Sequence, residues 1–187
     1  MATLTGFITH LGDKEDPFVA PSDGKIVAWA VELGHKPSDK VEEGEEGKSN
    51  LEFFQDTFGN ERFGKGPVGR IAILKRQGGV EFKLRSQSPA VKLTGPFYNQ
   101  DTVITLDKPL PIREGEIVGL TSHTWIPTLR SKARGGGNAG WRASLNRGNC
   151  DEAGILDGKE QKREGSVRQY GCPFTDRLFY KAYFVPN

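Results

Sequence analysis

Hydrophobic and polar residues alternate with a period of two along much of this chain, which is the pattern of β-strands. The clearest case is residues 80–85, where Val80, Phe82 and Leu84 alternate with charged side chains. Further strands are predicted at residues 25–31, 69–76, 90–94, 102–106, 117–120, 167–170 and 177–185. Turn residues separate these segments, so the pattern favours an all-β domain, a two-sheet β-sandwich of jelly-roll type.

The segment from Asp101 to Trp125 predicts two strands joined by a stiffened connection. Pro109 and Pro111 are expected to break the first strand, and a Glu-Gly pair turns the chain before residue 117. The arrangement is either a β-hairpin or a β-arch. Another glycine link, at residues 77–79, predicts a hairpin between the strands at 69–76 and 80–85.

The last predicted strand, residues 177–185, carries apolar side chains on both faces. Leu178, Tyr180, Ala182 and Phe184 share one face. An exposed strand of this composition would aggregate. We therefore expect it to lie in the middle of a sheet or to be covered.

Residues 33–66 interrupt the alternating pattern. Residues 41–47 are acidic and rich in glycine, which predicts a solvated loop. After this loop, Ser49 and Glu52 are spaced as a capping box, and apolar residues follow at helical spacing. The sequence thus predicts an inserted acidic loop and one short helix at residues 50–58.

The chain of 187 residues fits a single domain, 1–187. Its 24 glycines and 11 prolines suit short strands joined by polar loops. A net charge of only +2 provides no overall field that would attract nucleic acid or a membrane, and no apolar run is long enough to enter one. The first twenty residues lack a signal pattern, so the signal of a secreted protein would have to precede Met1.

Cys150 and Cys172 are placed to close one loop before the final strand. A disulfide there would contribute about 3 kcal/mol in the loop-entropy model and would favour a secreted or surface location. Two free thiols, or half of a metal site, are the alternatives. The long spacing and the lack of a neighbouring histidine argue against metal.

Residues 128–176 form a basic, glycine-rich region around this cysteine pair, and its arginines include Arg130, Arg134 and Arg142. The sequence RGGGNAG matches a dinucleotide fingerprint literally, but no βαβ unit surrounds it. A glycine loop is the simple interpretation. The alternative is an anion-binding concavity in which amides and arginines hold sulfate, carboxylate or phosphate groups, including those of acidic glycans.

Trp125 and Trp141 flank the basic segment. Tryptophans on loops or exposed sheet faces can hold sugar rings, with His123, Arg130 and Arg142 as polar partners, whereas core packing is the alternative. No catalytic motif assigns catalytic residues, and the three histidines lie far apart, so we expect no bound metal and no cofactor. A structural calcium ion that bridges loops through Asp151 and Asp157 is an alternative to this expectation.

Several segments resemble a group of secreted actinobacterial proteins without an established activity. They include TSHTWIP, GWRASLNRGNC, YGC, RLFYKAYF, IVAWAVELG, FFQDTFG and RIAILKR. The resemblance implies a strand-rich exported protein with a disulfide between Cys150 and Cys172. His123 stands where the group is expected to have proline.

These patterns predict a non-enzymatic extracellular or cell-surface module. Its partner would be a polysaccharide, an anionic ligand or another extracellular ligand. One alternative is a structural subunit that associates with copies of itself, and another is a hydrolase or lyase that acts on polysaccharide.

Overall fold

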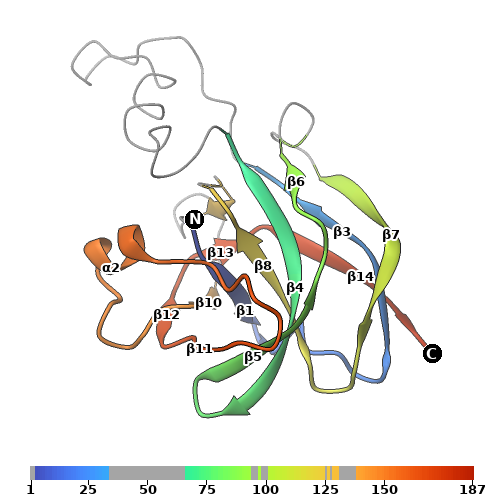
Figure 1. Ribbon diagram of the computed structural model, residues 1–187, viewed down its shortest axis with the longest axis horizontal. Helices are drawn as coiled ribbons and strands as arrows, with labels where there is room; N and C mark the ends of the chain where they lie inside the picture. Colours follow the sequence, from blue (N-terminus) through green and yellow to red (C-terminus); the bar gives the residue numbers. More distant parts are fainter. Residues whose placement is uncertain are drawn as a thin grey trace.

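β-Strands dominate the structure, as the period-two pattern predicts. The computed structural model describes residues 3–33, 66–93, 97, 101–124, 126, 128–130 and 138–187. These residues form an all-β sandwich of two packed sheets, a nine-stranded and a three-stranded one (Figure 1). A short ladder pairs β9 (Leu129–Arg130) with β13 (Arg177–Leu178).

The large sheet has the order β11-β5-β4-β8-β1-β10-β12, with β2 on β1 and β6 on β4. Its strands are β1 (Thr5–Leu11), β2 (Lys14–Glu15), β4 (Val68–Gly78), β5 (Glu81–Gln87), β6 (Val91–Lys92), β8 (Ile117–Ser122), β10 (Ala139–Ala143), β11 (Val167–Gln169) and β12 (Cys172–Phe174). The predicted hairpin is confirmed, because β4 and β5 pair antiparallel on either side of the glycine turn. β10 was missed, since its small residues hide the alternation.

The small sheet has the order β14-β3-β7. Its strands are β3 (Gly24–Val31), β7 (Thr102–Ile112) and β14 (Tyr180–Pro186). Trp29 of β3 is fully buried between the sheets, in one apolar cluster with Ile73 of β4 and Leu120 of β8. The hydroxyl of Tyr180 crosses the interface and donates to the carbonyl oxygen of Val118 at 2.9 Å. This cluster is the main core.

The large sheet also buries its opposite face. Three aromatic rings pack together there, with centroids 4.9 Å apart for Phe7 and Phe82, 5.5 Å for Phe7 and Tyr170, and 5.1 Å for Phe82 and Tyr170. Alternate residues of β4 serve the two cores, with Ile71 and Ile73 in the main core and Ala72 and Leu74 in the second one. Tyr170 belongs to the segment 158–171, which runs over this face.

The central segment is a β-arch rather than a hairpin. β7 pairs with β3 in the small sheet, whereas β8 pairs with β1 and β4 in the large sheet. The two prolines do not end the strand as predicted, because β7 continues through both of them to Ile112. Proline lacks the amide donor that a ladder needs, and β7 lies at a sheet edge, where only one side of the strand must pair.

The final strand is neither in the middle of a sheet nor covered on its outward face, which corrects the prediction. β14 is the other edge of the small sheet, and it pairs with β3 alone. Its outward residues are exposed, with Tyr183 at 41% and Val185 at 39% of full exposure. The alternating pattern predicted the strand and its inner face, but the place of a strand within a sheet depends on long-range pairing.

The predicted helix at residues 50–58 lies outside the described residues, as does most of the insertion at 33–66. The described helix is α2 (Glu152–Asp157), which the sequence pattern missed because six residues hold too little periodicity. Asp151 caps it by accepting a hydrogen bond from the amide of Gly154 at 2.9 Å.

The disulfide between Cys150 and Cys172 is confirmed, with a Cα–Cα distance of 5.3 Å. It ties β12 to the loop before α2. Helix α2 therefore begins next to the β12 edge of the large sheet, and the segment after it leads to β11, which pairs with β5 at the opposite edge (Figure 1).

Candidate functional site: a basic cavity beside helix α2

The candidate site is built on the segment that follows α2, and this segment is held by the start of the chain. The hydroxyl of Thr3 donates to the carbonyl oxygen of Gly158 at 3.0 Å. The amide of Gln161 donates to the hydroxyl of Thr5 at 3.0 Å, and Ser144 donates to the carbonyl oxygen of Lys159 at 3.2 Å. Residues at the start of β1 and just after the end of β10 thus fix an irregular stretch of backbone against the sheet.

The side chain of Gln161 anchors the same segment to the second core. It is fully buried, and its Nε2 donates to the carbonyl oxygens of Phe82 at 3.2 Å and Ser166 at 2.8 Å. Its Oε1 accepts a hydrogen bond from the hydroxyl of Tyr170 at 2.8 Å. Burial raises the pKa of Tyr170, so the phenol stays protonated and keeps donating.

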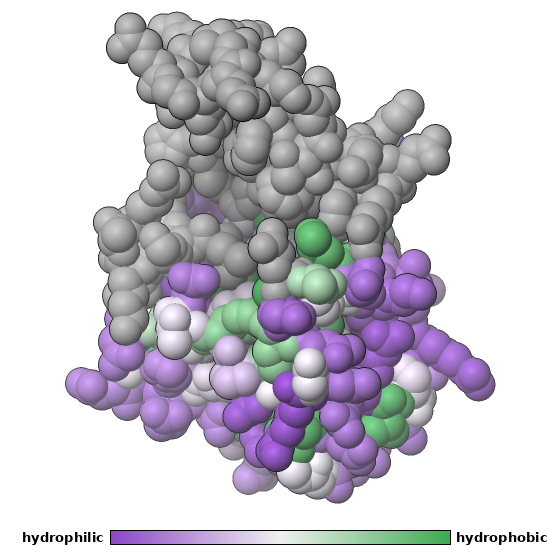
Figure 2. Space-filling model, turned by 90° about the vertical axis from the view of Figure 1, so that its left-hand side faces the viewer, coloured by the Kyte–Doolittle hydropathy of each residue, from purple (hydrophilic) through white to green (hydrophobic). Residues whose placement is uncertain are grey.

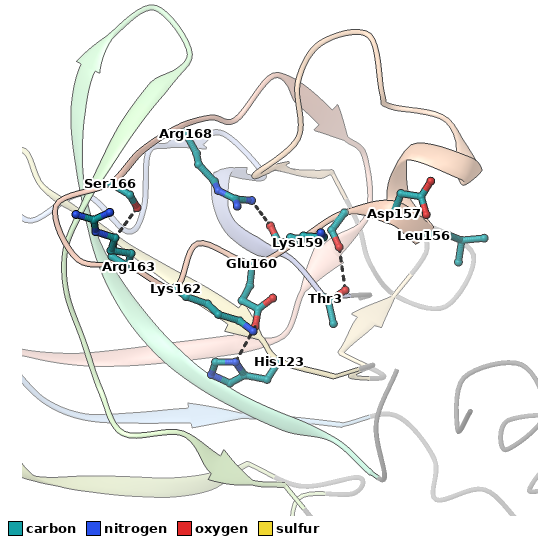
Figure 3. A pocket seen from close by; sticks show the side chains of 11 residues that line it. Thr3, His123, Leu156, Asp157, Lys159, Glu160, Lys162, Arg163, Ser166 and Arg168 are labelled. Carbon is teal, nitrogen blue, oxygen red and sulfur yellow. Dashed lines mark hydrogen bonds and ion pairs between the residues drawn. The ribbon is translucent and has the colours of Figure 1, made fainter. Parts of the chain in front are cut away.

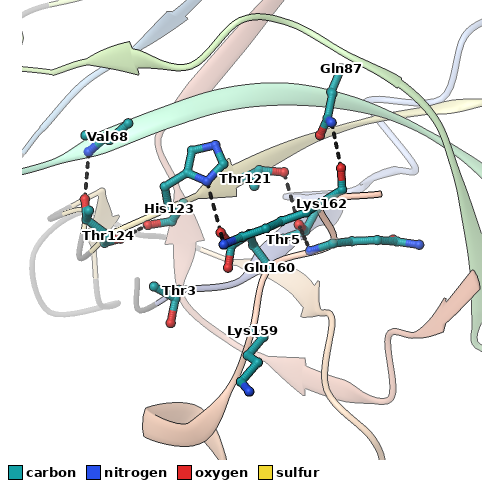
Figure 4. Close-up of polar contacts among 12 residues, drawn as sticks. Thr3, Thr5, Val68, Gln87, Thr121, His123, Thr124, Lys159, Glu160 and Lys162 are labelled. Atoms are coloured by element: carbon teal, nitrogen blue, oxygen red, sulfur yellow. Dashed lines mark hydrogen bonds and ion pairs between the residues drawn. The ribbon is translucent and has the colours of Figure 1, made fainter. Parts of the chain in front are cut away.

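Glu160 places a negative charge under the cavity. Only 5% of its side chain is exposed, and its Oε1 lies 3.0 Å from Nδ1 of His123 and 3.0 Å from Nζ of Lys162 (Figure 4). Burial alone would raise the pKa of Glu160, but hydrogen bonds from His123, Lys162 and its own amide outweigh burial and lower the pKa to about 2. The carboxylate is therefore ionised at neutral pH.

The ring of His123 serves to position Glu160. An ionised carboxylate can only accept, so Nδ1 of His123 carries the proton of their hydrogen bond. Nε2 is buried and has no hydrogen-bond partner among the described residues. Neither ring nitrogen of His123 is thus open to a molecule in the cavity.

The cavity above these residues has a volume of about 540 Å³, within the range of ligand pockets (Figure 3). Four lysines or arginines and two carboxylates line it, and Glu160 is already paired. The lining residues are Thr3, His123, Leu156, Asp157, Gly158, Lys159, Glu160, Lys162, Arg163, Ser166 and Arg168. We call it the basic cavity.

A second cavity of about 440 Å³ lies on the other side of Lys159 and Arg168, which line both. Nη1 of Arg168 donates to the carbonyl oxygen of Lys159 at 2.6 Å (Figure 3). The remaining walls are mostly uncharged, and the lining residues are Glu81, Ser144, Leu145, Asn146, Asn149, Gly154, Asp157, Gly158, Lys159, Val167, Arg168 and Gln169. We call it the polar cavity.

Of the predicted site residues whose side chains the structure describes, His123 is the one that lines the basic cavity. Trp141 is only 3% exposed and stacks on Phe174 with centroids 4.7 Å apart, which agrees with the alternative interpretation of core packing. Arg142 is half-buried, and its guanidinium donates to the carbonyl oxygen of Tyr170 at 3.2 Å. It lines a different, small cavity of about 80 Å³.

The side chains of the other predicted residues lie outside the described part of the structure. Trp125 and Arg134 lie outside the described residues, and Arg130 is described only as part of strand β9. Their role in binding stays a prediction. In the described part of the chain, the structure does not bring His123 and Arg142 into one cavity.

Sequence reasoning missed the basic residues that line the cavity: Lys159, Lys162, Arg163 and Arg168. Glu160 and Glu164 lie among them in the sequence and offset two of the four positive charges. The feature of the sequence that could have indicated the site is the clustering of basic residues. Four of them fall within ten positions, next to a strand and between the two cysteines of the disulfide. The structure separates the signs, because Glu160 is buried while Lys162 and Arg163 are exposed.

The described residues contain no group of three histidine, cysteine or acidic side chains arranged to hold a metal ion. Asp151 and Asp157 lie at the two ends of α2, where Asp151 acts as the helix cap. None of the helices in the described ranges is long and apolar enough to cross a membrane. On the face that carries α2, hydrophilic side chains predominate (Figure 2).

Comparison of the chain with protein-family models, with curated proteins and with solved structures gave no match. The resemblance to secreted actinobacterial proteins therefore stays a prediction.

Proposed function

We propose that this protein is a non-enzymatic extracellular module that binds the acidic group of a carbohydrate in the basic cavity. The observation that carries the proposal is the charge of the lining, in which Lys159, Lys162 and Arg163 are exposed. The carboxylate of Glu160 is buried and already paired with His123 and Lys162, so the lining keeps an excess of positive charge. Lysine and arginine heads around a concave surface favour carboxylate or sulfate groups. The structural disulfide supports a location outside the reducing cytosol.

The geometry favours binding over hydrolysis. A glycosidase needs one carboxylic acid that is protonated at working pH to donate to the leaving group. Glu160 has a pKa of about 2 and cannot supply that proton at neutral pH. His123 holds Glu160 through Nδ1, and its Nε2 is buried. These two titratable side chains of the cavity are thus committed to one another rather than to a substrate.

The test compares glucuronate with glucose, which differ in the carboxylate at C6. Binding is followed by NMR titration of the intact protein and of a Lys162→Ala, Arg163→Ala variant. We expect glucuronate to bind at least tenfold more tightly than glucose, and the variant to lose this preference. Added salt should weaken glucuronate binding, because the attraction is between exposed charges.

A matched control removes two exposed lysines elsewhere, with the substitutions Lys14→Ala and Lys108→Ala in β2 and β7. This control should bind glucuronate as the unchanged protein does. Equal affinity for glucuronate and glucose would refute the proposal. So would glucuronate affinity that survives in a folded Lys162→Ala, Arg163→Ala variant.

A second candidate function is self-association as a structural subunit. The outward face of the small sheet exposes Val103, Tyr183 and Val185, each by more than a third of its surface. Val103 pairs with Ala30, and Tyr183 pairs with Ala28, so these side chains share one face. Sedimentation analysis decides this candidate, because a subunit would form a dimer or larger species that Tyr183→Lys disrupts.

A further inference from the structure

The basic and polar cavities lie on either side of one ridge. Arg168 and Lys159 line both of them, and the hydrogen bond from Nη1 of Arg168 to the carbonyl oxygen of Lys159 joins the two residues at 2.6 Å. Asp157 and Gly158 line both cavities as well. A linear molecule that fills the basic cavity can therefore continue over this ridge into the polar one.

The two cavities differ in chemistry. The polar cavity has as many carboxylates as cationic groups, with Glu81 and Asp157 against Lys159 and Arg168. Three residues with amide side chains also line it: Asn146, Asn149 and Gln169. An amide offers both donors and an acceptor, which suits hydroxyl groups and gives no preference for an anion.

The polar cavity also offers an apolar surface. Val167 lines it and is 48% exposed, although it is a large aliphatic residue in a strand. A sugar ring presents hydroxyl groups at its edge and C–H groups on its face, so amides together with an exposed valine match one uncharged ring.

Both cavities have firmly held walls. The disulfide fixes Cys150 to β12, and the amide of Asn149 donates to the carbonyl oxygen of Asn146 at 2.9 Å. On the other side, β11 pairs with β5, and Gln169 lies opposite Glu81. A preformed groove loses little conformational entropy when it binds, which favours measurable affinity.

We propose that the two cavities form one groove for a linear heteropolysaccharide, with an acidic sugar in the basic cavity and an uncharged sugar in the polar cavity. This inference rests on the proposed function, because the acidic sugar is the anion assigned there. It adds the class of polymer and a second subsite. The order of the sugar units in the polymer matters, because the acidic ring and the uncharged ring occupy different cavities.

The probes are glucuronate and hyaluronan oligosaccharides, in which glucuronate alternates with an uncharged N-acetylated sugar. Calorimetry or NMR titration gives the affinity of the monosaccharide, the disaccharide and the hexasaccharide. We expect the disaccharide to bind at least tenfold more tightly than glucuronate. An acidic homopolymer, oligogalacturonate, should gain less from added length.

The variant Asn149→Ala, Gln169→Ala removes two amides of the polar cavity. It should lower disaccharide affinity to that of glucuronate and leave glucuronate affinity unchanged. Gln169→Ala alone tests the subsite without altering the loop before α2, and should give part of the same loss. The matched control, Gln77→Ala with Asn187→Ala, removes two exposed amides outside both cavities and should have no effect.

The outcomes separate the two proposals. If glucuronate does not bind, the proposed function fails and the groove fails with it. If glucuronate binds but a second sugar adds nothing, or if the folded variants keep full disaccharide affinity, the basic cavity stands and the groove is overturned. An equal or larger gain with oligogalacturonate overturns the assignment of an uncharged sugar to the polar cavity.

Discussion

Replacing Glu160 by glutamine removes the buried negative charge while keeping the shape of the side chain. The folded protein holds the pKa of Glu160 at about 2, against an ordinary value of 4.5. At about 1.4 kcal/mol for each pH unit, this difference corresponds to about 3 kcal/mol of unfolding free energy at neutral pH. Lys162 is 69% exposed, so solvent screens its share, and we expect Glu160→Gln to cost about 2 kcal/mol at pH 7.

The loss should depend on pH in a defined direction. As the pH falls below 4.5, an unfolded chain binds a proton at Glu160 that the folded protein does not bind until the pH is near 2. The contribution of Glu160 is therefore complete above pH 4.5 and is lost between pH 4.5 and 2. The difference in stability between the unchanged protein and Glu160→Gln should shrink over this range.

Urea denaturation at pH 7, 5, 4, 3 and 2.5 measures this difference. Glu15→Gln is the control, because Glu15 is an exposed carboxylate in β2, and we expect it to change stability by less than about 0.5 kcal/mol. A gap between the unchanged protein and Glu160→Gln that stays constant from pH 7 to pH 2.5 would refute the reasoning, because steric or packing effects alone do not titrate.

Two further predictions concern stability. Replacing both Cys150 and Cys172 by serine removes a link across a sequence separation of 22 residues. The loop-entropy model predicts that the free energy of unfolding, measured by urea denaturation, falls by about 3 kcal/mol. A loss below about 1 kcal/mol would contradict this prediction. Gln161→Ala removes a fully buried side chain that contacts Phe82, Ser166 and Tyr170, so we expect a loss of about 3 kcal/mol or more. An unchanged melting temperature would show that these buried groups find other partners.

The sequence predicted the fold class well because the alternation of apolar and polar residues in a strand is visible within the few residues of that strand. The hairpin of β4 and β5 needs only two alternating segments and a glycine turn, all within about twenty residues. The edge positions of β7 and β14 were not predictable in that way, because they depend on pairing with β3, which is far away in sequence for both. Pro109 and Pro111 are the local sign of an edge strand, because proline is tolerated there, but the same residues also predict the end of a strand.

The candidate site was largely hidden from sequence reasoning. His123 was proposed, but as a partner for sugar rings rather than as the residue that positions Glu160. In the sequence the charges of Lys162 and Arg163 are offset by their acidic neighbours. They become distinct only when Glu160 is buried and pairs with His123, which follows β8, and with Lys162. Burial of one charge in a mixed stretch is a tertiary property, so no local pattern indicates it.

The contacts that fix the backbone of the basic cavity join opposite ends of the sequence. Thr3 reaches Gly158 over 155 positions, and Thr5 reaches Gln161 over 156. Contacts of such long range close late in folding, because the entropy of the large loop is lost before the contact is gained. The cavity should therefore be among the last features to form. During synthesis the cavity forms only after the residues up to Arg168, which line it, have left the ribosome.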